Sequence, residues 1–206
     1  MYTQNKEQEY ILEYFKDFKG TLLDIGANDG KTFSNSLALI ENGWKACLVE
    51  PSYTAFDKLK ELHKGNDNVK LFNVAIGGEK GVLTFHESGC HLKDKSDHAL
   101  LSSLDESETL KWKKAGVAFN KYDVSVITYS DLVGIDGANF DFITIDAEGL
   151  DIEILKQIDL THTSLLCIEW NSIVANKLVI LEYSSQFGMN KIIYESGENL
   201  LICRAK

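Results

Sequence analysis

The chain has 206 residues, of which 44% are hydrophobic and 25% are charged, and its formal net charge at pH 7 is −10. A chain of this length can bury one full hydrophobic core, so we expect a single domain over residues 1–206. The acidic balance disfavours nucleic acid as a partner, because nucleic-acid-binding proteins usually present a basic face.

The first half of the chain alternates between helical and strand-like patterns. Residues 4–18 carry apolar side chains at helical spacing, so we expect residues 1–19 to form an N-terminal helical segment. An apolar strand at 21–25 runs into a glycine turn, and we expect a helix to start directly after that turn, over residues 31–41. The next predicted elements are a strand at 44–49, a helix capped by Ser52 and ending at residue 65, and strands at 69–76 and 81–87.

The alternation stops at residues 88–122, which are rich in polar residues. We interpret this segment as an insertion or lid, with a short helix near 107–114 and with His86 at its root. The run of polar residues 86–98 fits no standard zinc spacing, so a polar loop is the better interpretation. The alternation then resumes with strands at 122–128, 140–145, 164–168, 191–195 and 200–204, and with helical segments at 130–133, 150–158 and 172–186.

Strands that alternate with helices predict a mostly parallel sheet with helices on both faces. The last two strands are joined by a turn too short for a crossover helix, so they must be antiparallel. Such a sheet binds its ligand outside the carboxyl ends of its strands. Each polar residue at those ends could be a simple turn residue or helix cap, but together they indicate a site: Asp24, Glu50, Asn73, Asp146 and Glu169.

The turn after the first strand favours one adenosine ligand over another. Asp24 ends the strand and Asp29 lies in the turn, so two carboxylates would repel the phosphates of a dinucleotide. S-adenosylmethionine (SAM) has no phosphate, its ammonium and sulfonium suit carboxylates, and its own carboxylate can accept hydrogen bonds from the loop N–H groups. Asn28 suits a position of positive φ, and Glu50 can accept hydrogen bonds from the ribose hydroxyls of any adenosine ligand. We therefore predict a SAM pocket.

Six short stretches between residues 20 and 170 occur in an order typical of one family. They are Asp24-Ile25-Gly26-Ala27-Asn28-Asp29-Gly30, Val49-Glu50-Pro51, Asn73-Val74-Ala75-Ile76-Gly77, Ser102-Ser103-Leu104, Val126-Ile127-Thr128 and Phe142-Ile143-Thr144-Ile145-Asp146-Ala147-Glu148-Gly149. With these residues the chain resembles the FkbM-like family of class I SAM-dependent methyltransferases. The resemblance implies a Rossmann-like α/β fold, with a sheet of about seven strands that is parallel except for an antiparallel last strand. It also implies O-methylation of a sugar or another small hydroxylated metabolite.

The resemblance further implies what each residue of the cofactor site does. Asp24 would hold the ammonium of SAM, Glu50 would bind its ribose, and Asp146 would sit beside the methyl-bearing sulfur. Asn73 and Ala75 would lie near the adenine, and the glycine loop would lie against the methionine part. The cofactor-binding set implied in this way is Asp24, Gly26, Ala27, Asn28, Gly30, Glu50, Pro51, Asn73, Ala75 and Asp146.

Methyl transfer to oxygen is an in-line displacement, so the enzyme must orient a hydroxyl and remove its proton. Four residues are candidate catalytic bases: Asp146, Glu148, His86 and Glu169. We favour Glu148 or Asp146, because the motif turns both toward the pocket, although Glu148 could instead stabilise a helix dipole and Asp146 could cap a helix. A divalent metal held by Asp146, Glu148 and Glu169 is the less favoured alternative, because carboxylate clusters often remain metal-free. We therefore assign no metal ligand.

Two other classes of function remain open. One is a catalytically idle SAM-binding regulatory module, and the other is an NAD-dependent oxidoreductase, which Asp29 and the missing third glycine disfavour. We expect a small-molecule partner, with a sugar or glycoside as the first candidate, and the sequence leaves the oligomeric state open. No apolar leader or membrane-spanning run is present, and the cysteines form no CxxC pair, so we expect a reduced, cytoplasmic protein without a membrane partner; the cysteines are Cys47, Cys90, Cys167 and Cys203.

Overall fold

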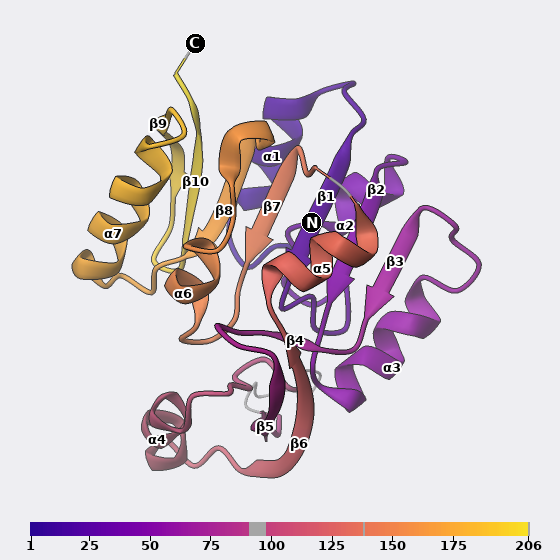
Figure 1. Ribbon diagram of the computed structural model, residues 1–206, viewed down its shortest axis with the longest axis vertical. Coiled ribbons are helices and arrows are strands. Elements are labelled where there is room, and N and C mark those ends of the chain that lie inside the picture. The colour runs from indigo at the N-terminus through magenta and orange to yellow at the C-terminus, as the bar shows by residue number, and fades with distance from the viewer. Residues whose placement is uncertain (91–97, 138, 206) are drawn as a thin grey trace.

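A seven-stranded sheet forms the centre of the computed structural model, which describes residues 1–90, 98–137 and 139–205 (Figure 1). The strand order is β3-β2-β1-β7-β8-β10-β9. The first five strands in that order are parallel, and β10 is antiparallel to both of its neighbours. This is the predicted class I arrangement. The strands are β1 (Thr21–Ile25), β2 (Lys45–Val49), β3 (Val69–Phe72), β7 (Phe142–Ile145), β8 (Leu165–Glu169), β9 (Met189–Glu195) and β10 (Asn199–Arg204).

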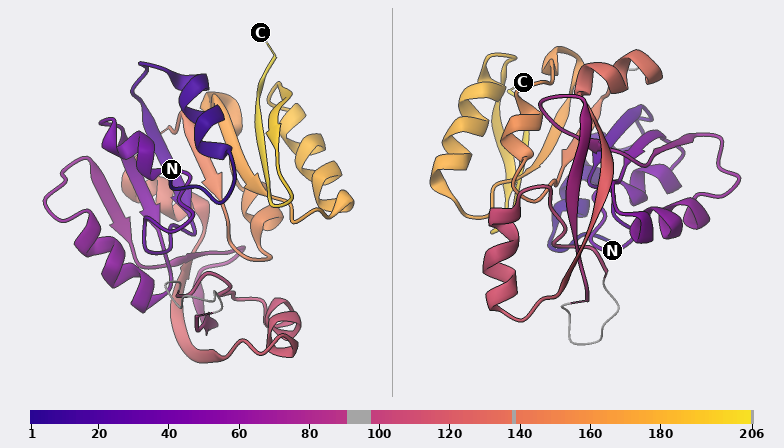
Figure 2. Two further views of the ribbon diagram at one scale, coloured as in Figure 1. Left: turned by 180° about the vertical axis from the view of Figure 1, so that it is seen from behind. Right: turned by 60° about the horizontal axis from the view of Figure 1, so that its bottom comes forward.

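Helices cover both faces of this sheet (Figures 1 and 2). Successive residues of a strand point to opposite faces, so Leu22 and Leu23 of β1 belong to two different hydrophobic clusters. One face packs against α1 (Glu7–Phe15), α2 (Leu37–Glu41) and α3 (Tyr53–Leu62). The other packs against α5 (Tyr129–Asp136), α6 (Asp151–Leu155), the short 3-10 helix η1 (Leu160–His162) and α7 (Val174–Ser185).

A second, three-stranded sheet lies beyond the carboxyl edge of the main sheet (Figure 1). Its order is β4-β6-β5, and a helix, α4, precedes β6. The elements are β4 (Ala75–Ile76), β5 (Gly81–Ser88), α4 (Glu106–Lys114) and β6 (Phe119–Ile127). The helix predicted near 107–114 is thus confirmed.

The single strand predicted at 69–76 was wrong, because the chain changes sheets at Asn73. The side-chain amide of Asn73 donates hydrogen bonds to the carbonyl oxygens of Glu50 (2.8 Å) and Pro51 (3.2 Å). These bonds hold Asn73 at the end of β2, and Ala75 and Ile76 pair with β6 instead. The alternation of apolar residues could not reveal this change, because both short strands are apolar.

The helix predicted over residues 31–41 was also wrong in its first half, because α2 begins only at Leu37. The carboxylate of Asp29 accepts hydrogen bonds from the N–H groups of Lys31 (2.9 Å) and Thr32 (2.7 Å), as a helix cap would. Phe33, however, has φ of 56° and pairs with Thr3, so the chain leaves the helical path at that residue. An irregular segment therefore follows the glycine turn where the sequence predicted a helix N-terminus.

Within the described ranges, no helix is both long enough and apolar enough to cross a membrane. The four cysteines form no disulfide, and three of them are buried. A buried thiol packs as a small apolar group. This agrees with the apolar strands in which the sequence places Cys47 and Cys167.

Candidate active site

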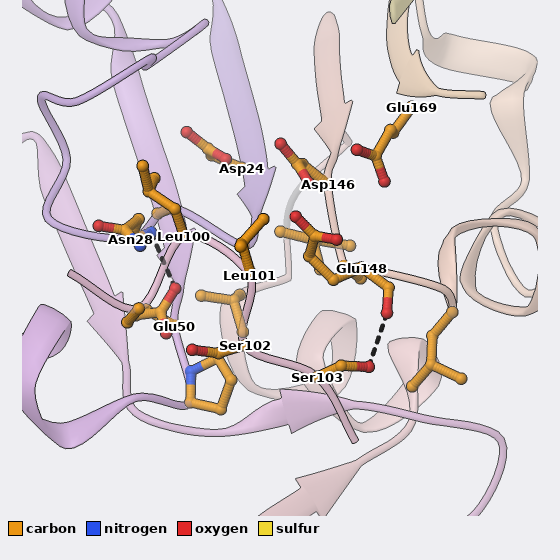
Figure 3. A pocket seen from close by; sticks show the side chains of 18 of the residues that line it. Asp24, Asn28, Glu50, Leu100, Leu101, Ser102, Ser103, Asp146, Glu148 and Glu169 are labelled. Atoms are coloured by element: carbon orange, nitrogen blue, oxygen red, sulfur yellow. Dashed lines mark hydrogen bonds between the residues drawn. The ribbon is translucent and has the colours of Figure 1, made fainter. Parts of the chain in front are cut away.

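A cavity of about 300 Å³ lies between the carboxyl edge of the main sheet and the second sheet (Figure 3). Parallel strands end at a common edge, which is why residues far apart in the sequence meet there. Most of the predicted site residues line this cavity. They are Asp24, Gly26, Ala27, Asn28, Glu50, Pro51, Ala75, Asp146, Glu148 and Glu169.

One end of the cavity is formed by the turn after β1, which we call the cofactor end. Gly26 has φ of 87°, and a Cβ atom at this position would lie 1.8 Å from the carbonyl oxygen of Asp146. Only glycine allows β1 and β7 to approach this closely. Asn28 has φ of 48°, as expected of the residue that best replaces glycine in a turn.

Glu50 is fixed at the cofactor end by hydrogen bonds to both of its carboxylate oxygens. The N–H of Asn28 donates to Oε2 (2.8 Å), and the N–H of Ser52 donates to Oε1 (2.7 Å). Burial raises the pKa of Glu50 to about 7, although these two bonds act in the opposite direction. Asp24 is buried beside it and accepts a hydrogen bond from the hydroxyl of Ser36 (2.5 Å), and burial raises its pKa to about 6.

The opposite end holds three carboxylates, which we call the acidic triad: Asp146, Glu148 and Glu169. One oxygen from each lies within 4.8 Å of one oxygen of the other two. Figure 3 shows the three side chains turned toward one another. They come from the end of β7, from the loop after it and from the end of β8.

The loop that carries the acidic triad is held by its own backbone contacts. The carboxylate of Asp151 accepts hydrogen bonds from the N–H groups of Ala147 (2.8 Å) and Gly149 (3.2 Å). The hydroxyl of Ser103 donates to the carbonyl oxygen of Glu148 (2.6 Å). Neither ordinary role considered for the motif carboxylates is seen, because α6 starts only at Asp151 and has no side-chain cap from Asp146.

The protein compensates the acidic triad only in part, through Asn171 beside Glu169 and the charge of Lys111 near Glu148. Glu169 is 8% exposed, and its Oε2 has no hydrogen-bond partner among the described residues. Asp146 is exposed to solvent in the ligand-free cavity, and Glu148 is partly exposed. Burial, reinforced by the neighbouring carboxylates, raises the pKa of Asp146 to about 8 and holds the pKa values of Glu148 and Glu169 well above their usual range.

Three predicted site residues lie outside the cavity lining. Gly30 packs beneath α3, where a Cβ would lie 2.5 Å from a methyl group of Leu59. Asn73 reaches the site only through its hydrogen bonds to the backbone of Glu50 and Pro51. His86 is buried in β5, with its backbone paired to Ser103, and burial lowers its pKa.

The wall opposite the strand ends was only partly foreseen. Residues 99–104 form it, together with Lys111 and Trp112 of α4. The backbone N–H and carbonyl of Ser103 are both bonded to His86, and the N–H of Leu101 donates to the hydroxyl of Ser88, so this segment is a fixed wall. Residues 91–97 of the predicted lid lie outside the described residues.

Several further lining residues carried no recognisable pattern in the sequence. They are polar residues from several loops and from the start of β10, and only the fold brings them together: Gln4, Asn35, Asn171, Glu198 and Asn199. Asn171 follows Glu169 closely at the end of β8, so the strand-end rule could have found it. For the others, the sequence contains no comparable signal.

Comparison with protein families and solved structures agrees with this geometry. The family model described as "Methyltransferase FkbM domain" matches residues 24–190. A structure of the "delta-N METTL16 MTase domain" is similar with a TM-score of 0.51 at 14% identity, covering 95% of this chain and 79% of that one. A second structure, the "METTL16 MTase domain", has a TM-score of 0.51 at 12% identity, and the match covers 96% of this chain and 66% of that one.

A precorrin-6y C5,15-methyltransferase from Geobacter metallireducens GS-15 has a TM-score of 0.47 at 10% identity, and the match covers 98% of this chain and 88% of that one. The two METTL16 structures, at 12–14% identity and a TM-score of 0.51, indicate a common fold and no more. No curated protein matches the chain significantly.

Proposed function

The chain belongs to the FkbM methyltransferase family, and from this premise we propose that it transfers a methyl group from SAM to a hydroxyl of a small metabolite, with sugars and glycosides as the first candidates. One observation carries the proposal. A single cavity joins a fixed turn suited to SAM with a group of carboxylates suited to a hydroxylated acceptor.

The cofactor end supports SAM binding through residues that are already in position. We propose that the ribose hydroxyls donate to Glu50, whose oxygens keep free lone pairs beside their two backbone hydrogen bonds. Asp24 would hold the ammonium, and Gly26 leaves room for the methionine part against the turn. Asn73 would act as a positioning residue, through the backbone of Glu50.

The acidic triad supports an oxygen acceptor over an amine. Nearby carboxylates would keep an amine protonated, and an ammonium has no lone pair with which to attack the methyl group. A hydroxyl needs only to lose its proton. We propose that Glu148 or Asp146 takes this proton while the new C–O bond forms and the C–S bond of SAM breaks, leaving S-adenosylhomocysteine.

The test is transfer of a labelled methyl group from SAM by the purified protein. Three acceptor panels are compared: sugars and glycosides, small amines, and RNA with protein. We expect label on a hydroxyl oxygen of one or more members of the first panel, identified by mass spectrometry. Transfer only to amines, RNA or protein would contradict the proposal.

Binding measurements separate the remaining alternatives. Titration with SAM and with NAD should show binding of SAM only. Binding of NAD without binding of SAM would contradict the proposed SAM site. If SAM binds but no panel is methylated, the protein is better described as a regulatory SAM-binding module.

A further inference from the structure

We propose that the acidic triad, Asp146, Glu148 and Glu169, binds one divalent cation of the Mg²⁺ or Mn²⁺ class. Sequence reasoning assigned no metal ligand, and the geometry of the three side chains now points to one. The inference concerns the end of the cavity where methyl transfer would take place.

The first argument is the convergence of three hard oxygen donors. One oxygen of each carboxylate lies within 4.8 Å of those of the other two, so a single ion placed among them can contact all three. Carboxylate oxygens are the ligands that Mg²⁺ and Mn²⁺ prefer. Three protein ligands leave the remaining coordination positions open to water or to a substrate oxygen.

The second argument is a buried oxygen that has no partner. Glu169 is 8% exposed, and its Oε2 accepts no hydrogen bond from any residue in the described ranges. A buried carboxylate of this kind is costly unless something compensates its charge. Figure 3 shows the Glu169 side chain directed toward the other two carboxylates, so the missing partner belongs in the space among them.

The protein's own cations compensate the acidic triad only in part, because the charge of Lys111 acts on Glu148 and Glu169 without forming an ion pair with them. None of the ion pairs found among the described residues includes a member of the acidic triad. The lysine that lines the same cavity, Lys111, is paired with Glu108 at 2.5 Å. A divalent cation from solution would supply this compensation when the three carboxylates are ionised.

The ligands also stand on fixed backbone. Asp146 ends a central strand, Glu148 is tied through its carbonyl to Ser103, and Asp151 holds the loop between them. A site whose ligands are already ordered loses little conformational entropy when the ion binds.

The use of the cation rests on the proposed function, whereas its binding does not. A hydroxyl oxygen of the acceptor would occupy one open position and become more acidic there. Its proton would pass to a carboxylate oxygen not engaged with the ion, and the oxygen would then attack the methyl group of SAM. Removal of the cation should therefore stop turnover.

The test is a titration of the SAM-free protein with Mn²⁺, followed by electron paramagnetic resonance, and with Mg²⁺ by calorimetry. We expect one ion per chain in the wild-type protein. Glu169→Gln, which keeps the side-chain shape and removes the charge, should bind at least about 10-fold more weakly. The matched control is Glu153→Gln on α6, the same change outside the cavity lining, and it should bind as the wild type does.

The proposal is overturned if the wild-type protein shows no saturable binding, or if Glu169→Gln binds as tightly as the wild type. Thermal melting checks that each variant is folded, and Asp146→Asn provides the same test should Glu169→Gln fail to fold. Methyl transfer that persists in chelator would refute the catalytic use of the cation and leave the proposed function intact. Stoichiometric cation binding without any methylated acceptor would support the cation site and contradict the proposed function.

Discussion

The two ends of the cavity differ in how their carboxylates are compensated. At the cofactor end, Glu50 accepts two backbone hydrogen bonds and Asp24 accepts one from a hydroxyl. At the opposite end, Oε2 of Glu169 accepts none, and no hydrogen bond from a described residue reaches the carboxylates of Asp146 or Glu148. The first end is thus preorganised before any ligand binds, whereas the second needs a ligand to complete it.

The backbone shows the same contrast. In the turn after β1, positive φ angles fall on Gly26, Asn28 and Gly30, which tolerate them, and only beyond the turn does one fall on a bulky residue, Phe33. At the acidic triad they fall on Glu148 (46°), Asn171 (52°) and Ser172 (55°). Two of these three residues are of types for which such angles cost about 1–3 kcal/mol each. Strain of this size persists only where the surrounding contacts enforce it.

The largest expected effect is on catalysis. If Glu148 removes the proton of the acceptor, Glu148→Gln should slow methyl transfer by about 10²- to 10⁴-fold and leave SAM affinity nearly unchanged. Single-turnover assays and SAM titration measure the two quantities separately. Glu153→Gln should retain wild-type rates. Normal turnover in Glu148→Gln would show that Glu148 is not the base and would leave Asp146 as the candidate.

The next effect concerns the cofactor end. Gly26→Ala should lower the free energy of unfolding by at least about 3 kcal/mol and abolish SAM binding, because the new methyl group would collide with the carbonyl of Asp146. Gly65→Ala is the control, since Gly65 has a similar positive φ and no atom near its Cβ position. Gly65→Ala should lower the free energy of unfolding, measured by chemical denaturation, by only about 1–2 kcal/mol. Equal losses in both variants would mean that the close contact at Gly26 is unimportant.

A smaller effect is expected from pH. The pKa of Glu50 is raised to about 7 and that of Asp24 to about 6. The folded protein therefore holds protons that the unfolded chain releases, and this contribution to stability is lost as pH rises through the folded pKa. Between about pH 6 and about pH 8 these two groups should together lower the free energy of unfolding of the ligand-free protein by about 1–2 kcal/mol, and the raised pKa values of the acidic triad act in the same direction.

Chemical denaturation at several pH values measures this slope. Glu50→Gln cannot titrate at this position, so its slope should be flatter. A wild-type stability that increases from pH 6 to pH 8 would contradict the raised pKa values.

The smallest effect tests the uncompensated end. In the absence of divalent cations, Glu169→Gln should raise the free energy of unfolding by about 1 kcal/mol, because a neutral amide is less costly to bury than an unpartnered carboxylate. Added Mn²⁺ should stabilise the wild-type protein, so that its free energy of unfolding then exceeds that of Glu169→Gln. Destabilisation by Glu169→Gln without cations would indicate that the charge is compensated within the protein.

The sequence predicted the main sheet well, because strand position and direction follow from local patterns. The apolar run at 21–25 became β1 with the predicted bounds, and the short turn before β10 correctly required an antiparallel pair. The FkbM motifs correctly indicated the family, since short runs such as residues 24–30 and 142–149 are themselves the turns that form the site.

Errors arose where distant contacts outweigh local preference. The helix expected from residue 31 gave way to a segment shaped by Asp29 and by pairing of Phe33 with Thr3. The strand expected at 69–76 was divided by the hydrogen bonds of Asn73 to the end of β2. Propensity over a short window cannot register a partner that lies in another part of the chain.

The sequence by itself determined the family, the parallel sheet and the acids at its strand ends, because each depends on residues close together in the chain. Only the tertiary structure decided which carboxylates lie close together and which of them lack hydrogen-bond partners. It also decided which of the predicted residues lie outside the cavity lining. Gly30, Asn73 and His86 lie outside the cavity lining, whereas Glu169 lies beside Asp146 and Glu148. Distances and burial depend on how strands far apart in the sequence are placed side by side, and no local pattern encodes that placement.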